Sequence, residues 1–225
     1  MIFERLGRHQ EAALDISRAI KFPEADNFAI LNQAIDILAR AGKAAECSGA
    51  MTAALKLPEA NNFGTLLRYA RLARGLNDDR QAVQLVSTAL AARDGAAASN
   101  LIDAGELLCK VDAERYKAYV AEHILNYLRA RGGYTVQDTG RMASLYLECD
   151  DMQGAEACLQ AVVRSAPGAD AYFQLALVEV RLGKTQEARA AMASAFRHDP
   201  GRSQELARHE PWQSLVRQLM MHDRR

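Results

Sequence analysis

The chain has few prolines and few aromatic residues: five prolines in 225 residues, and 6% Phe, Trp and Tyr combined. Strands are enriched in aromatic and β-branched residues, whereas Ala, Leu, Arg, Glu and Gln, which are abundant here, are good helix formers. Hydrophobic residues still make up 49% of the sequence, enough to bury a substantial core. The composition therefore predicts a folded, mainly helical protein.

The chain also lacks net charge, because 28 basic and 28 acidic residues cancel. This balance removes the nonspecific attraction to phosphates on which most nucleic-acid-binding proteins rely. The first residues, 1–7, lack the basic segment and apolar run of a signal peptide, and no later apolar stretch is long enough to span a membrane. We expect a cytoplasmic location, no membrane insertion and little affinity for nucleic acid.

Sequence signatures of metal sites and of catalysis are absent as well. The four cysteines form no CxxC pair and have no histidines at zinc-ligand spacing, so we expect reduced, packed thiols: Cys47, Cys109, Cys149 and Cys158. There is no GxGxxG, P-loop, GxSxG or HExxH motif. Glu148, Asp150 and Asp151 are interpreted as a helix end, a turn and an N-cap. We therefore expect no enzyme activity, no metal and no cofactor.

What the sequence does contain is an internal repeat. Residues 21–28 read Lys-Phe-Pro-Glu-Ala-Asp-Asn-Phe, and residues 56–63, 35 positions later, read Lys-Leu-Pro-Glu-Ala-Asn-Asn-Phe. Small residues keep the same step at Ala12, Cys47 and Ala82, and a step of 33 separates Ala155 from Ala188 and Pro167 from Pro200. Such a period is typical of stacked helical repeats.

Each repeat contains two amphipathic stretches with apolar residues at helical spacing, joined by a short turn. Residues suited to a helix C-cap or to the N-cap of the next helix stand at the turns: Gly7, Gly42, Asn77-Asp78-Asp79, Asp150-Asp151 and Gly183. Each repeat is therefore predicted to be a helical hairpin.

These positions resemble the tetratricopeptide repeat (TPR) family. The last repeat matches its pattern with Tyr172, Leu175, Ala176, Ala188, Met192, Ala195 and Asp199-Pro200, and the preceding repeat with Met142, Ala143, Tyr146, Ala155, Leu159 and Pro167. Glu179 departs from the pattern, because it stands where a tyrosine is expected. The resemblance implies an all-α fold, a right-handed α-solenoid of antiparallel helix hairpins.

We expect a single repeat domain over residues 1–225. It would contain a partial first repeat (1–24), repeats at about 26–58 and 61–94, a degenerate repeat at 97–131, repeats at 136–167 and 169–200, and capping helices at 201–225. Gly132-Gly133 breaks the helix after the degenerate repeat. The incomplete first repeat would leave an apolar end exposed, which permits self-association through that end.

In TPR proteins the first helix of each hairpin lines a concave groove, so the resemblance implies that a partner's peptide or helix binds there. The predicted groove residues are Asn32, Asp36, Arg40, Arg68, Arg71, Arg74, Arg141, Ser144, Glu148, Phe173, Leu177 and Arg181. Arginine pairs with carboxylates through two parallel hydrogen bonds, which favours an acidic peptide with an apolar anchor on Phe173 and Leu177. Two alternatives stay open: the arginines form an ordinary solvated face, and the Trp212 helix covers Phe173.

The sequence thus predicts a non-catalytic scaffold that binds another protein. The 35-residue step also resembles the pentatricopeptide family, whose repeats read RNA bases, so RNA binding is one alternative. The other is an accessory or regulatory module of a larger secretion, polysaccharide or signalling assembly. The sequence identifies neither the partner nor the pathway.

Overall fold

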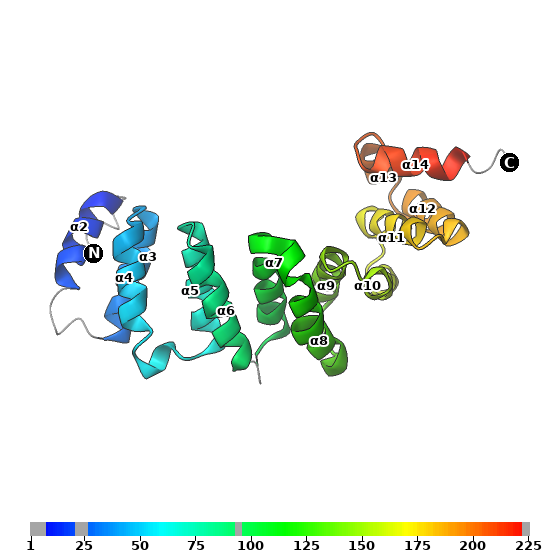
Figure 1. Ribbon diagram of the computed structural model, residues 1–225. Helices are drawn as coiled ribbons and strands as arrows, with labels where there is room; N and C mark the ends of the chain where they lie inside the picture. Colours follow the sequence, from blue (N-terminus) through cyan, green and yellow to red (C-terminus); the bar gives the residue numbers. More distant parts are fainter. Residues whose placement is uncertain (1–7, 21–26, 93–95, 222–225) are drawn as a thin grey trace. The chain divides into compact units, whose positions relative to one another are not determined.

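A computed structural model describes residues 8–20, 27–92 and 96–221, and the regular elements in these ranges are all helices (Figure 1). The chain divides into two compact units, Met1–Val111 and Asp112–Arg225. Residues 1–7, 21–26, 93–95 and 222–225 lie outside the described ranges.

Unit 1 is built from two complete hairpins with a helix on either side. Its elements are α2 (His9–Ala19), α3 (Phe28–Arg40), α4 (Ala44–Ala54), the short 3-10 helix η2 (Pro58–Ala60), α5 (Phe63–Gly75), α6 (Asp79–Ala91) and the first part of α7 (Ala98–Val120). Helix α3 packs on α4, and α5 packs on α6. Small residues at the crossings let the helices approach closely, since Ala34, Cys47, Ala70 and Ala82 are fully buried.

The repeated octapeptide shapes the link between hairpins. Pro58 starts η2, where its missing N–H costs no hydrogen bond. The Asn62 side chain then accepts a hydrogen bond from the Thr65 N–H and caps α5. The other copy of the motif ends in the same way, with Asn27 accepting from the backbone of Ala29 and capping α3. In the described residues, both copies therefore contain an asparagine that caps the next helix, and the second copy also forms the turn of η2.

Unit 2 begins at a break inside α7. Asp112 has a non-helical backbone (φ −162°, ψ 96°), and its side chain caps the following turn by accepting from the Arg115 N–H. The helix continues through a π-helical turn, η3 (Ala121–Leu125), into α8 (Asn126–Arg131). It ends at Gly132 and Gly133, whose positive φ angles of 66° and 75° favour glycine.

Two further hairpins and a terminal helix pair complete unit 2. They are α9 (Val136–Glu148) with α10 (Met152–Ser165), α11 (Ala169–Arg181) with α12 (Thr185–His198), and α13 (Pro200–Leu206) with α14 (Trp212–Met221). Helix α13 packs on α11 and α12, and α14 packs on α12. The predicted fold class, an all-α array of antiparallel helix hairpins, is confirmed. The prediction of one domain over 1–225 stays a prediction.

Candidate functional site

Three of the predicted groove residues meet between the first helices of neighbouring hairpins. Arg68 on α5 donates a hydrogen bond to Asn32 on α3 at 2.9 Å and lies 3.6 Å from the Asp36 carboxylate. The Tyr69 hydroxyl donates to the same Asn32 oxygen. Burial raises the pKa of Tyr69 to about 12, so this hydroxyl stays protonated as a donor. Helices α3 and α5 are therefore connected by a polar cluster.

The other two α5 arginines reach toward the first part of α7. Arg71 pairs with Asp103, and Arg74 donates to the Lys110 backbone carbonyl at 2.7 Å. A surface hollow of about 290 Å³ lies here, lined by Arg71, Arg74, Gly75, Asp103, Glu106, Leu107 and Lys110. We call it the charged hollow, because five of these seven side chains are charged. Asp103, Glu106 and Lys110 were not among the predicted groove residues.

The charged hollow is exposed enough for its ion pairs to exchange. The Arg71 side chain keeps 51% of its surface accessible, and Arg74 keeps 38%. Ion pairs at such positions contribute about 0–1 kcal/mol, because water screens them and long side chains lose entropy on pairing. A bound carboxylate can therefore replace the internal partner of either arginine at small cost.

The remaining predicted groove residues lie on α3, α9 and α11. Arg40 lies exposed at the end of α3, Arg141, Ser144 and Glu148 lie on α9, and Leu177 and Arg181 lie on α11. Phe173 does not line a groove, and the alternative left open by the sequence, that the Trp212 helix covers it, is the one observed. Phe173 is 0% exposed, its ring meets Trp212 edge-to-face at 5.6 Å, and Phe196 lies on it as well. Helix α14 covers Phe173, so this residue belongs to the core and not to a groove.

Residues 170–201, which include α12 and most of α11, match the family model of the tetratricopeptide repeat. Residues 170–201 are therefore identified as a tetratricopeptide repeat within an array of helix hairpins. No curated protein matches the sequence.

Solved TPR structures resemble the chain in fold. One is the C-terminal part of a TPR repeat-containing protein from Cytophaga hutchinsonii, with a TM-score of 0.63, 11% identity, and coverage of 87% of this chain and 76% of that one. Another is PilW, titled a widely conserved type IV pilus biogenesis factor, with a TM-score of 0.55, 16% identity, and coverage of 96% and 94%. Yeast Tom70 has a TM-score of 0.50 and 16% identity over 95% of this chain and 44% of its own. At these identities the likeness shows the fold alone.

Asp150 and Asp151, at the turn between α9 and α10, make contacts that stabilise the fold. Asp151 accepts a hydrogen bond from the Gly154 N–H at 2.7 Å and pairs with Arg129 at 3.0 Å. Asp150 pairs with Lys117 at 2.9 Å. Among the residues that the structure describes, no group of three or more His, Cys, Asp or Glu side chains has a geometry that would hold a metal ion. Within the same residues, no helix is long and apolar enough to cross a membrane.

The departure from the TPR pattern at Glu179 has a chemical consequence. Glu179 is 4% exposed, and one of its carboxyl oxygens has no hydrogen-bond partner in the described part of the chain. The neighbouring buried glutamate, Glu156, is instead neutralised by Lys184, whose Nζ lies 2.8 and 2.6 Å from its two oxygens. Burial first, and then repulsion by Glu156, raises the pKa of Glu179 to about 7. The sequence analysis identified Glu179 as a departure from the TPR pattern, but it did not predict the raised pKa.

Two of the cysteines, Cys47 and Cys158, lie where burial disfavours the reactive thiolate. Cys47 and Cys158 have pKa values raised to about 11, mainly because burial disfavours the thiolate. Cys47 donates a weak hydrogen bond to the Ile35 carbonyl at 3.6 Å. The cysteines form no disulfide within the described part of the chain, and Cys47 and Cys158 behave as small packing residues.

Proposed function

We propose that this protein is a non-catalytic scaffold that binds an extended peptide or a helix of a partner protein on the first helices of unit 1, namely α3, α5 and the first part of α7. The observation that carries the proposal is the charged hollow. It joins two predicted groove arginines, Arg71 and Arg74, to a surface depression in which their present partners are weakly held. TPR proteins generally act as scaffolds without catalysis, which supports the same function.

A ligand with at least one carboxylate fits this site best. The lining carries three basic side chains and two acidic ones. Arg74 uses its guanidinium on a backbone carbonyl, and the Lys110 ammonium makes no hydrogen bond or ion pair within the described residues. A peptide carboxylate placed between Arg74 and Lys110 would pair with the Lys110 ammonium and compete with the Asp79 carboxylate, which lies 3.9 Å from the Arg74 guanidinium. Asp103 and Glu106 would in turn disfavour a uniformly acidic segment.

The test is binding of a fluorescein-labelled peptide with two glutamates flanking a leucine, measured by anisotropy. The double substitution Arg71→Glu and Arg74→Glu should weaken binding at least about tenfold, because it replaces attraction by repulsion at the hollow. Arg80→Glu is the matched control, since Arg80 is exposed on α6 of the same unit, away from the lining. Equal affinities of the double variant and the control, with unchanged helical circular dichroism, would remove the assignment.

Two parts of the proposal rest on the sequence alone. We place the protein in the cytoplasm, and we retain RNA binding and a role as an accessory module of a larger assembly as alternatives. A pull-down from the source cell lysate at low and moderate salt, with and without nuclease, separates the classes. Retained protein that survives nuclease supports the scaffold, whereas material lost on nuclease treatment and on a modest rise in salt supports RNA binding.

A further inference from the structure

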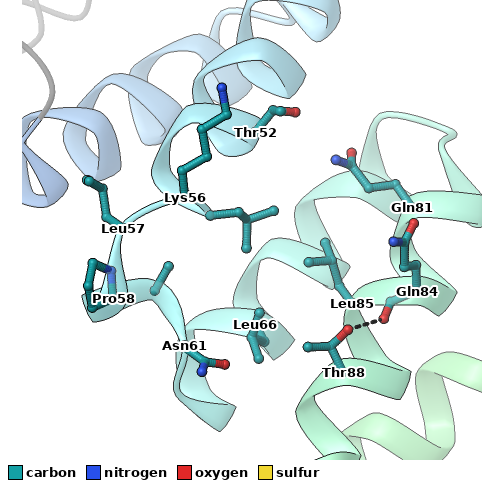
Figure 2. A pocket seen from close by; sticks show the side chains of 12 residues that line it. Thr52, Lys56, Leu57, Pro58, Asn61, Leu66, Gln81, Gln84, Leu85 and Thr88 are labelled. Carbon is teal, nitrogen blue, oxygen red and sulfur yellow. Dashed lines mark hydrogen bonds between the residues drawn. The ribbon is translucent and has the colours of Figure 1, made fainter.

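Unit 1 has a second and larger surface hollow on the side of its second helices. It measures about 560 Å³ and lies between the end of α4, the link containing η2, and α6 (Figure 2). Its lining residues are Thr52, Leu55, Lys56, Leu57, Pro58, Ala60, Asn61, Leu66, Gln81, Gln84, Leu85 and Thr88. We call it the amide hollow, after the three carboxamide side chains among them. Its volume is in the range of pockets that take a drug-sized ligand or a few peptide residues.

The link between α4 and α5 forms one wall of this hollow. It runs over residues 55–62 and includes the turn of η2, whereas the link between α10 and α11 runs only over residues 166–168. Pro58 fixes the backbone of the turn, and Ala60 anchors it because its side chain is buried. The wall is therefore held in place in the absence of any ligand, which lowers the cost of ordering on binding.

The floor of the amide hollow is apolar. Leu66 and Leu85 are buried beneath it, and Leu55 and Leu57 are half-buried at its side. In Figure 2 the Leu66 and Leu85 side chains lie between the link and α6, on the side facing the hollow. A branched apolar side chain of a ligand would cover the accessible surface of Leu55 and Leu57, which is favourable in proportion to the area removed from water.

The rim is polar and almost uncharged. Gln81 and Gln84 are one helical turn apart on α6, and Asn61 lies on the link across from them (Figure 2). Within the described residues these three carboxamides make no hydrogen bond, and Lys56, the single charged side chain of the lining, makes no ion pair. Each carboxamide offers both a donor and an acceptor.

We propose that the amide hollow is a second docking site, which takes an extended, uncharged segment of a partner protein with one branched apolar side chain. An extended main chain presents N–H and C=O groups that need both donors and acceptors, and the carboxamides supply both. A helix satisfies its own main chain, so it would leave the carboxamides without partners. A charged segment would lose hydration against a lining that holds one charge, whereas the charged hollow holds five.

The experiment is NMR titration of the ¹⁵N-labelled full chain with the capped pentapeptide acetyl-Ser-Val-Leu-Ser-Gly-amide. We expect saturable shifts in the backbone of residues 81–88 and in the carboxamide NH₂ groups of Gln81 and Gln84, with a Kd of about 1 mM or below. The same peptide with glutamate in place of leucine should bind at least about tenfold more weakly. Absence of saturable shifts, or shifts confined to α5 and α7, would overturn the proposal.

Two variants complete the test. Gln84→Glu adds a charge to the rim and should weaken binding of the leucine peptide at least about tenfold, while Gln153→Glu, an exposed position on α10, should leave it unchanged. Equal binding by both variants would overturn the proposal. The double variant Arg71→Glu and Arg74→Glu should still bind the leucine peptide, so this site and the charged hollow can fail independently.

Discussion

Replacing Glu179 with glutamine tests whether a buried carboxyl group lowers the stability of unit 2 at neutral pH. Glu179 is almost completely buried, one of its oxygens lacks a partner among the described residues, and its pKa is raised from 4.5 to about 7. A tenfold change in proton affinity corresponds to about 1.4 kcal/mol, so this rise in pKa corresponds to a loss of about 3 kcal/mol in the free energy of unfolding once the residue is ionised in both states.

Glu179 makes the free energy of unfolding depend on pH only where the folded and the unfolded chain differ in the protonation of this residue. Below about pH 4.5 the Glu179 carboxyl is protonated in the folded and the unfolded chain, and its ionisation costs no stability. Between pH 4.5 and about 7 the unfolded chain releases a proton that the folded chain keeps, so stability falls as the pH rises. Above about pH 7 the loss stays constant. Glutamine cannot ionise, so Glu179→Gln should be near neutral at pH 4.5 and stabilising by about 2–3 kcal/mol at pH 8.

Urea denaturation between pH 4.5 and 8 measures this difference, and the chain contains a convenient probe. Trp212 is the single tryptophan, and it packs on Phe173 in unit 2. Its fluorescence therefore reports the unfolding of the unit that contains Glu179. The control is Glu148→Gln, an exposed glutamate on α9 of the same unit, which should shift the curves by less than about 0.5 kcal/mol at every pH. Parallel stability curves for the wild type and Glu179→Gln would refute a protonated Glu179.

Two packing predictions follow from the same unit. Gly154→Ala should destabilise unit 2 by about 1–3 kcal/mol in thermal unfolding, because the new Cβ would lie 2.5 Å from the Tyr146 ring. Gly49→Ala, where a Cβ meets no atom within 4 Å, should instead be neutral or slightly stabilising. A larger loss of stability for Gly49→Ala than for Gly154→Ala would contradict this packing. Phe173→Ala should cost about 3–5 kcal/mol and change the Trp212 emission. An unchanged emission spectrum would show that α14 does not cover Phe173.

The sequence was sufficient for the helices and their pairing, because these depend on local signals. Helical periodicity and turn residues are properties of short segments, and Gly42 and Gly183 do adopt the positive φ angles that C-caps need. The cover on Phe173 was harder to predict. The sequence pattern of an apolar helix residue is the same whether a ligand or another helix covers that residue. Only the packing of α14 shows that a helix covers Phe173.

The partners of the groove arginines were also missed, although a signal for them exists. Side-chain contacts between neighbouring repeats join residues about one period apart: Asn32 with Arg68, Arg71 with Asp103, Arg74 with Lys110, Lys117 with Asp150, and Asp170 with Arg202. The separations are 36, 32, 36, 33 and 32 residues, close to the 33–35 of the repeat itself.

This regularity follows from the stacking of repeats. Each hairpin contacts only its neighbours, so equivalent positions of consecutive hairpins face each other. Opposite charges at an offset of 32–36 residues are visible in the sequence alone, and they pair Arg71 with Asp103. The same offset indicates that the arginine face is not uniformly basic. Asp103 competes with a ligand carboxylate for Arg71, so Asp103→Asn should strengthen binding of the acidic peptide where Arg71→Glu and Arg74→Glu weaken it.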